Sequence, residues 1–74
     1  MTVTRHDLVY RAAYRVVAAP AGEYLTVGDV YLCDGVPCGD DPRVTFGLHR
    51  ACDGSGTYLS ATLLDRGLVV LERE

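Results

Sequence analysis

Between residues 8 and 19 the hydrophobic positions gather on one side of a helical wheel. At about 100° per residue, one broad arc holds Leu8, Val9, Ala12, Ala13, Val16, Val17 and Ala19. Asp7 is a good N-cap residue, no glycine or proline interrupts the stretch, and Pro20 is a helix breaker. The pattern predicts an amphipathic helix over residues 8–19.

The second half of the chain carries further residues that are typical of helix starts and helix ends. Asp41 before Pro42 is typical of a helix start, and Val44, Gly47, Leu48 and Ala51 have the spacing of a buried helical face. These signals predict helices over residues 43–52 and 58–66, the second ended by Gly67 and followed by a β-prone segment at 68–72. A shorter helix is expected over 27–33, followed by a loop over 34–41.

The same residues also fit an all-β interpretation. Residues 10–16 alternate between apolar and polar positions, and residues 24–32 can form two strands around Gly28 and Asp29. Residues 44–52 and 57–64 flank a Gly-rich turn, as the strands of a hairpin would. The first prediction is therefore an α+β domain with three to four short helices and a small β element, and the alternative is a small all-β barrel.

The run from Leu63 to Val69, Leu-Leu-Asp-Arg-Gly-Leu-Val, resembles the end of the recognition helix and the entry to the wing in winged helix-turn-helix domains. The upstream run Leu-Thr-Val-Gly-Asp-Val at 25–30 is similar to the short strand and second-helix start of that class. The resemblance rests mainly on residues 42–72 and implies a winged-helix-like fold. It departs from the class on the supposed recognition helix, where the outward arc carries Asp65 and no cation.

Composition narrows the function classes. The 74 residues form one expected domain, 1–74, with ten acids, seven basic residues and a net charge of −3. All basic residues are arginine, which we attribute to codon bias in a GC-rich genome. Nucleic acid is a disfavoured partner for a net-acidic domain. No apolar run reaches the ~18 residues of a membrane helix, and no secretory signal is recognised, so a cytoplasmic location is expected.

Three cysteines make an odd count, which favours free thiols over a disulfide framework. One candidate zinc site combines Cys33, Cys38, His49 and Cys52, and it requires a helix to bring His49 and Cys52 together. In the alternative interpretation Cys33 and Cys52 are small core residues and His49 is solvated. No catalytic constellation or phosphate-binding loop is recognised, so neither an enzyme nor a cofactor is expected.

Candidate binding residues lie on the predicted helices. Arg11, Tyr14 and Arg15 would share the polar face of the first helix, and Phe46 would lie exposed beside Arg43 and Arg50 on the second. The alternatives are an ordinary polar face, paired with the acids of residues 20–41, for the first group and packing of Phe46 under the acidic loop for the second. The expected function is a non-enzymatic regulatory interaction module that binds a protein partner or forms a homodimer. A winged-helix DNA-binding regulator that uses Arg43, Arg50 and the first-helix arginines is one alternative, and a small β-barrel binding module is the other.

Overall fold

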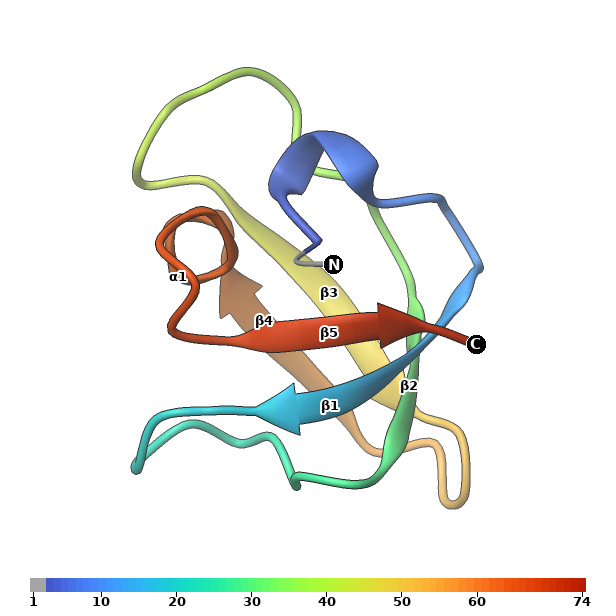
Figure 1. The fold of residues 1–74 in the computed structure, drawn as a ribbon. Coiled ribbons are helices and arrows are strands. Elements are labelled where there is room, and N and C mark those ends of the chain that lie inside the picture. Colours follow the sequence, from blue (N-terminus) through green and yellow to red (C-terminus); the bar gives the residue numbers. More distant parts are fainter. Residues whose placement is uncertain (1–2) are drawn as a thin grey trace.

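The computed structural model describes residues 3–74, so the first two residues of the predicted 1–74 domain lie outside the described part. Its main element is one antiparallel sheet (Figure 1), whose strands are β1 (Ala13–Ala18), β2 (Val30–Cys33), β3 (Thr45–Arg50), β4 (Gly56–Ser60) and β5 (Val70–Arg73). A 3-10 turn η1 (Arg5–Asp7) and one short helix α1 (Ala61–Asp65) complete the described elements.

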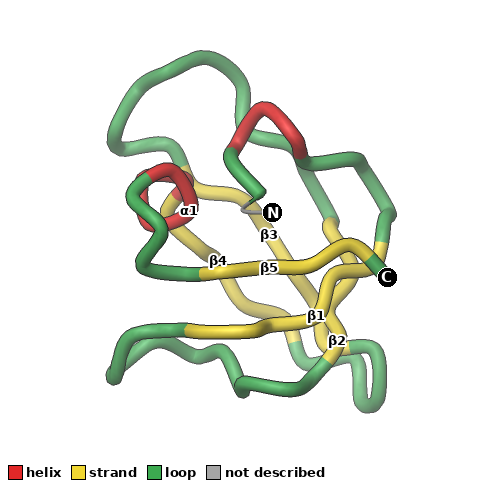
Figure 2. Tube along the Cα trace, in the orientation of Figure 1, coloured by secondary structure: helices red, strands yellow, loops and turns green. Residues whose placement is uncertain are grey.

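Strand order explains how the chain encloses a core. The sheet runs β4-β3-β2-β1-β5, so the first four strands each lie beside their neighbour in sequence. After β4 the chain forms α1 and returns to pair β5 with β1, at the opposite end of the strand order. Figure 2 shows the two helical pieces at one end of this curled sheet. Within residues 3–74 no pairing joins β4 to β5, so the sheet does not close into the predicted alternative, a barrel.

The predicted helix over residues 8–19 is wrong. Its central part is strand β1, in which Tyr14 and Val16 are buried while Arg15 and Val17 are exposed. Apolar residues in this stretch satisfy a period of two as well as a helical period. Pairing on both sides, with β2 and β5, decides for the strand because it satisfies the backbone and buries one face.

The predicted helix over 43–52 is also wrong. Residues 45–50 form β3, which buries Phe46 and Leu48 and pairs with β4 as a hairpin, so the hairpin of the all-β interpretation is confirmed. Asp41 does not start a helix. Its carboxylate accepts a hydrogen bond from the Arg43 N–H at 2.8 Å and its carbonyl accepts one from Val44 N–H at 3.1 Å, which makes a turn.

Of the remaining sequence predictions, some are confirmed and others are wrong. The predicted helix over 27–33 is wrong, because β2 occupies residues 30–33, whereas the loop over 34–41 is confirmed. The helix over 58–66 survives only as α1. Its predicted stop at Gly67 is confirmed, with φ +73° and a 3.0 Å hydrogen bond from the Gly67 N–H to the Leu64 carbonyl. The β-prone end becomes β5. With one five-residue α-helix in the described chain, the α+β winged-helix prediction and its resemblance are wrong.

A single cluster of buried apolar side chains lies between the sheet and α1. It comprises Leu8, Ala12, Tyr14, Val16, Tyr31, Cys33, Phe46, Leu48, Leu59, Ala61, Leu64, Val69 and Leu71. Members come from all five strands and from α1, so the hydrophobic effect draws the sequence together from both ends. The resulting fold is compact, with a Cα radius of gyration of 10.8 Å.

One charged side chain is buried at the end of this core. Arg5 is 4% exposed, and its Nε donates to the Asp65 carboxylate at 2.6 Å. Its Nη1 donates to the carbonyls of Gly39 and Asp41 at 3.2 and 3.0 Å, and its backbone N–H donates to Asp65 at 3.0 Å. The Arg5 guanidinium therefore joins η1, α1 and the β2–β3 loop, which Figure 1 shows at the same end of the molecule.

We expect Asp65→Ala to destabilise the fold more than Arg5→Met does. Asp65→Ala leaves a buried guanidinium without its carboxylate, whereas Arg5→Met leaves a partly exposed carboxylate that water can solvate. Arg5→Met is expected to cost about 2 kcal/mol through its lost charged hydrogen bonds. Urea unfolding of both variants checks the order, and an Asp65→Ala protein as stable as Arg5→Met would contradict it.

The same contact predicts a pH dependence. Hydrogen bonds from the Arg5 backbone and then from its side chain lower the pKa of Asp65 below its ordinary value of 3.8. The stabilisation is therefore complete above the unfolded-state pKa and is lost as pH falls through the lower folded-state pKa. Thermal melts between pH 6 and about pH 2 should show a steeper acid-side loss for the wild type than for Asp65→Asn. Parallel profiles would contradict this assignment.

Candidate functional site

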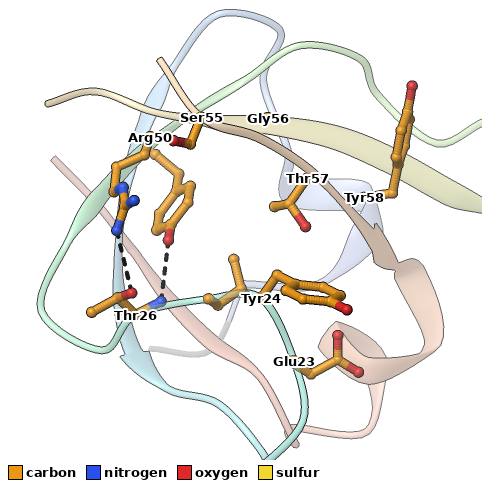
Figure 3. Close-up of a pocket in the computed structure, with 10 residues that line it drawn as sticks. Glu23, Tyr24, Thr26, Arg50, Ser55, Gly56, Thr57 and Tyr58 are labelled. Atoms are coloured by element: carbon orange, nitrogen blue, oxygen red, sulfur yellow. Dashed lines mark hydrogen bonds between the residues drawn. The ribbon is translucent and has the colours of Figure 1, made fainter. Parts of the chain in front are cut away.

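A surface depression lies between the β1–β2 loop and the start of β4 (Figure 3). It measures about 720 Å³ and is lined by Glu23, Tyr24, Leu25, Thr26, Tyr31, Arg50, Ser55, Gly56, Thr57 and Tyr58. We refer to these ten residues as the loop–hairpin groove. One wall is a loop and the other is the β3–β4 hairpin, so the groove brings together segments that are about thirty residues apart in sequence.

The floor of the groove is held by hydrogen bonds from the sheet to the loop. Tyr31 is 2% exposed, and its hydroxyl accepts a hydrogen bond from the Thr26 N–H at 3.1 Å. Arg50 lies opposite Tyr31 in the β2–β3 register and reaches the Thr26 hydroxyl at 3.5 Å. Figure 3 shows both contacts as dashed lines. The β1–β2 loop is thereby positioned against β3 at its Thr26 end.

Arg50 is the one arginine of the groove, and its charge is already compensated. Its guanidinium pairs with Asp29 at 3.2 Å and with Asp53 at 2.8 Å. Hydrogen bonds from Arg50, followed by those from Ser55, lower the pKa of Asp53 to about 2, and the two carboxylates raise the pKa of Arg50. Arg50 therefore acts as a structural cation at this site and is poorly placed to bind an added anion.

Two tyrosines on opposite walls are largely exposed. Tyr24 is 85% exposed and Tyr58 is 78% exposed, whereas other aromatic rings of the described chain are buried in the core. In Figure 3 the Tyr24 ring lies across from Thr57, whereas the Tyr58 ring points away from the loop. Tyr58 lies opposite Gly47 in the β3–β4 register, and its ring lies over that glycine on the outer face, where a Cβ at Gly47 would be 3.8 Å from Tyr58 Cε1.

A second, smaller pocket of about 420 Å³ lies on the β2–β3 surface and is lined by Tyr10, Arg11, Leu32, Cys33, Asp34 and His49. Arg11 has φ +67°, an uncommon backbone conformation for a residue other than glycine, and its guanidinium lies 5.3 Å from the Tyr10 ring centroid. His49 pairs through Nδ1 with Asp34. Cys33 is fully buried, and burial raises the pKa of its thiol, which disfavours the nucleophilic thiolate.

The residues predicted for the polar face of a first helix do not share a face. Tyr14 is 1% exposed, and its hydroxyl accepts a hydrogen bond from the Val9 N–H at 2.9 Å. Arg15 pairs with Glu74 at 2.6 Å, and Arg11 lies beside Tyr10 in the smaller pocket. The expected arrangement of Tyr14 between two arginines on a solvent face is wrong, because alternation along β1 turns Tyr14 into the core.

The second group of predicted residues is also separated. Phe46 is 4% exposed in the core, so its expected exposure is wrong. Arg43 is exposed and pairs with Asp41 at 3.2 Å. Of the six predicted binding residues, the structure places Arg50 alone in the loop–hairpin groove. The sequence analysis did not predict Tyr24 or Glu23 as site residues, because nothing in their sequence context shows that their side chains line a groove.

The four residues of the candidate zinc site lie in different surroundings. Cys33 is buried in β2, Cys38 is exposed in the β2–β3 loop and Cys52 is exposed in the β3–β4 turn. His49 contacts Asp34 instead of a thiol. The helix that this site required is replaced by β3, and no group of three potential ligands occurs among the described residues. The arrangement offers no zinc-binding geometry.

Comparison of the chain with protein-family models, with curated proteins and with solved structures finds no match. Within residues 3–74, neither helical segment has the length and apolar character that a membrane crossing requires.

Thiol accessibility gives a direct check on this surface. We expect iodoacetamide to modify Cys38 and Cys52 in the native protein and to leave Cys33 unmodified, because a buried thiol with a raised pKa is both inaccessible and protonated. Mass spectrometry of the folded protein should therefore show two adducts, and the urea-unfolded protein should show three. Rapid native labelling of Cys33 would mean that the β2 region opens readily.

Proposed function

We propose that this chain is a non-enzymatic interaction module that binds a segment of a partner protein in the loop–hairpin groove. The observation that carries the proposal is the exposed ring of Tyr24, which lies across from Thr57 in a groove whose floor is held by hydrogen bonds and whose rim carries a second exposed tyrosine, Tyr58, on the outer face of β4. Tyrosine is enriched at the energetic centres of protein interfaces. The fold of the module is mostly sheet, which is closer to the alternative of a small β-barrel binding module than to a winged-helix regulator.

Tyrosine suits this role because it offers a large contact area with few rotatable bonds. Each ring can bury on the order of 150 Å² at low entropic cost. A standard interface buries about 800 Å² on each partner, so the Tyr24 ring, the groove beside it and the Tyr58 ring at its rim provide a substantial part of one. The groove is open to solvent and not enclosed, a form that fits a chain segment better than a small molecule, which binds in an enclosed cavity.

Electrostatics favours a protein over a nucleic acid. Affinity for nucleic acid comes largely from uncompensated arginines and lysines that contact phosphates. The groove has Arg50 alone, and both Asp29 and Asp53 compensate it. The recognition helix that a winged-helix regulator would use is absent from residues 3–74, since α1 has five residues and its Asp65 is bonded to Arg5.

A displayed library of random twelve-residue peptides provides the test. We expect enriched peptides to bind the wild-type chain, and Tyr24→Ala to weaken them at least about tenfold, because truncation of a central interface aromatic typically costs more than about 1.4 kcal/mol. Tyr10→Ala is the matched control, since Tyr10 is also exposed but lines the smaller pocket.

Circular dichroism should confirm that both variants remain folded. Equal affinity for wild type and Tyr24→Ala, or a larger effect of Tyr10→Ala, would refute the assignment to the loop–hairpin groove. A library that yields no binder for the wild-type chain would refute the proposed function.

A further inference from the structure

β4 has one unpaired side, and the hydrogen-bond pattern identifies the groups that point from it. Arg50 N–H donates to the Ser55 carbonyl at 2.8 Å, and Ala61 N–H donates to the Val44 carbonyl at 3.0 Å. In an antiparallel ladder these pairs alternate with pairs whose backbone groups point outward. The β3–β4 register therefore directs the backbone N–H and C=O of Gly56 and Tyr58 away from β3.

These outward groups have no protein partner in the part of the chain that the structure describes. Both residues also line the loop–hairpin groove, so the free edge of β4 borders it. An exposed strand edge with unsatisfied backbone groups is a template for an added strand. In that mode of recognition the backbone supplies affinity, and alternate side chains supply specificity.

The charge around this edge selects the kind of segment that would add. Residues 20–41 carry five acids and no arginine, but four of these acids already have a partner: Asp29 pairs with Arg50, Asp34 with His49, Asp40 with His6 and Asp41 with Arg43. Glu23 lies in the groove beside Tyr24 and has no ion-pair partner among the described residues. Arg50 does not offset this charge, because Asp29 and Asp53 both pair with it.

We propose that the partner segment is an extended, basic stretch of polypeptide that adds as a further strand along the free edge of β4. This inference rests on the proposed function and specifies its ligand. Side chains of the added strand alternate between the two faces of the sheet. The residue opposite Tyr58 packs against the Tyr58 ring on the outer face. Its two neighbours point into the groove, where an arginine or lysine lies over the Tyr24 ring and pairs with Glu23.

A second copy of the chain is a poorer occupant of the same edge. Pairing β4 with β4 would bring together two net-acidic chains, each of charge −3, at a groove whose unpaired charge in each copy is the carboxylate of Glu23. Like charges at short range oppose such a contact. The basic segment gains from the same field that repels a second copy.

The test uses synthetic eight-residue peptides of alternating arginine and valine, with glutamate in place of arginine as the charge control. We expect the arginine peptide to bind, and to slow amide hydrogen exchange at Gly56 and Tyr58 about tenfold or more. The glutamate peptide should not bind. An arginine peptide methylated on alternate backbone nitrogens should bind about tenfold more weakly, because it lacks the donors that pair with β4.

Two substitutions refine the result. Glu23→Gln should weaken the arginine peptide about threefold, as loss of a surface ion pair does, whereas Glu72→Gln on β5 should have no effect. Tyr58→Pro removes an outward N–H that β3 does not use, so it should reduce binding about tenfold in the folded variant. If that variant does not fold, the methylated peptide still decides the question.

The outcomes separate this inference from the proposed function. Library peptides that depend on Tyr24 but leave exchange at Gly56 and Tyr58 unchanged would overturn strand addition and preserve groove binding. Equal binding of arginine and glutamate peptides would overturn the choice of a basic segment. Concentration-dependent protection of both amides without any peptide would identify a second copy as the occupant and overturn the proposal.

Discussion

The arrangement of this small chain depends on the buried guanidinium of Arg5. It lies at the end of the core where η1, α1 and the β2–β3 loop meet, and it donates to one carboxylate and two backbone carbonyls. A charge in this position is tolerated because Asp65 and the carbonyls of Gly39 and Asp41 surround it with acceptors. The contact joins residue 5 to residue 65, so it ties the start of the described chain to the segment that leads into β5. A core contributed by five short strands and one helical turn leaves little margin for an unpaired charge.

Arg50 has a comparable role at the other end of the sheet. Its pairs with Asp29 and Asp53 and its contact with Thr26 connect the β1–β2 loop to the β3–β4 hairpin. These contacts position the two walls of the loop–hairpin groove relative to one another. They also compensate the charge of the groove's one arginine, so that Arg50 is poorly placed to bind a ligand. The groups that remain accessible to a ligand are the rings of Tyr24 and Tyr58, the carboxylate of Glu23 and the backbone of the free edge of β4. A surface with these properties is preorganised for an extended polypeptide, which is why both proposals concern the same groove.

Sequence patterns located most of the breaks in the chain but gave the wrong structure to two long segments. Residues 8–19 and 45–50 contain apolar residues whose spacing satisfies both a period of 3.6 and a period of two. Local capping signals at Asp7 and Asp41 favoured helices, yet both are used in turns or loops. Strand pairing between segments far apart in sequence outweighed those signals, and β1 gained partners on both sides. The candidate binding residues failed for the same reason, because a change from helix to strand moves Tyr14 and Phe46 from the surface into the core.

By itself the sequence determined several local features. These are the loop over 34–41, the turn between the two strands of the β3–β4 hairpin, the helix end at Gly67 and the β-prone C-terminal segment. These features depend on residues that act locally, through glycine's access to positive φ and the hydrogen bonds of aspartate. It also determined the concentration of acidic residues at 20–41. The tertiary structure alone decided which face of each segment is buried, which arginines are compensated and that Tyr24 lies across a groove from Thr57. Those properties arise from contacts between residues distant along the chain, and no short-range pattern encodes such contacts.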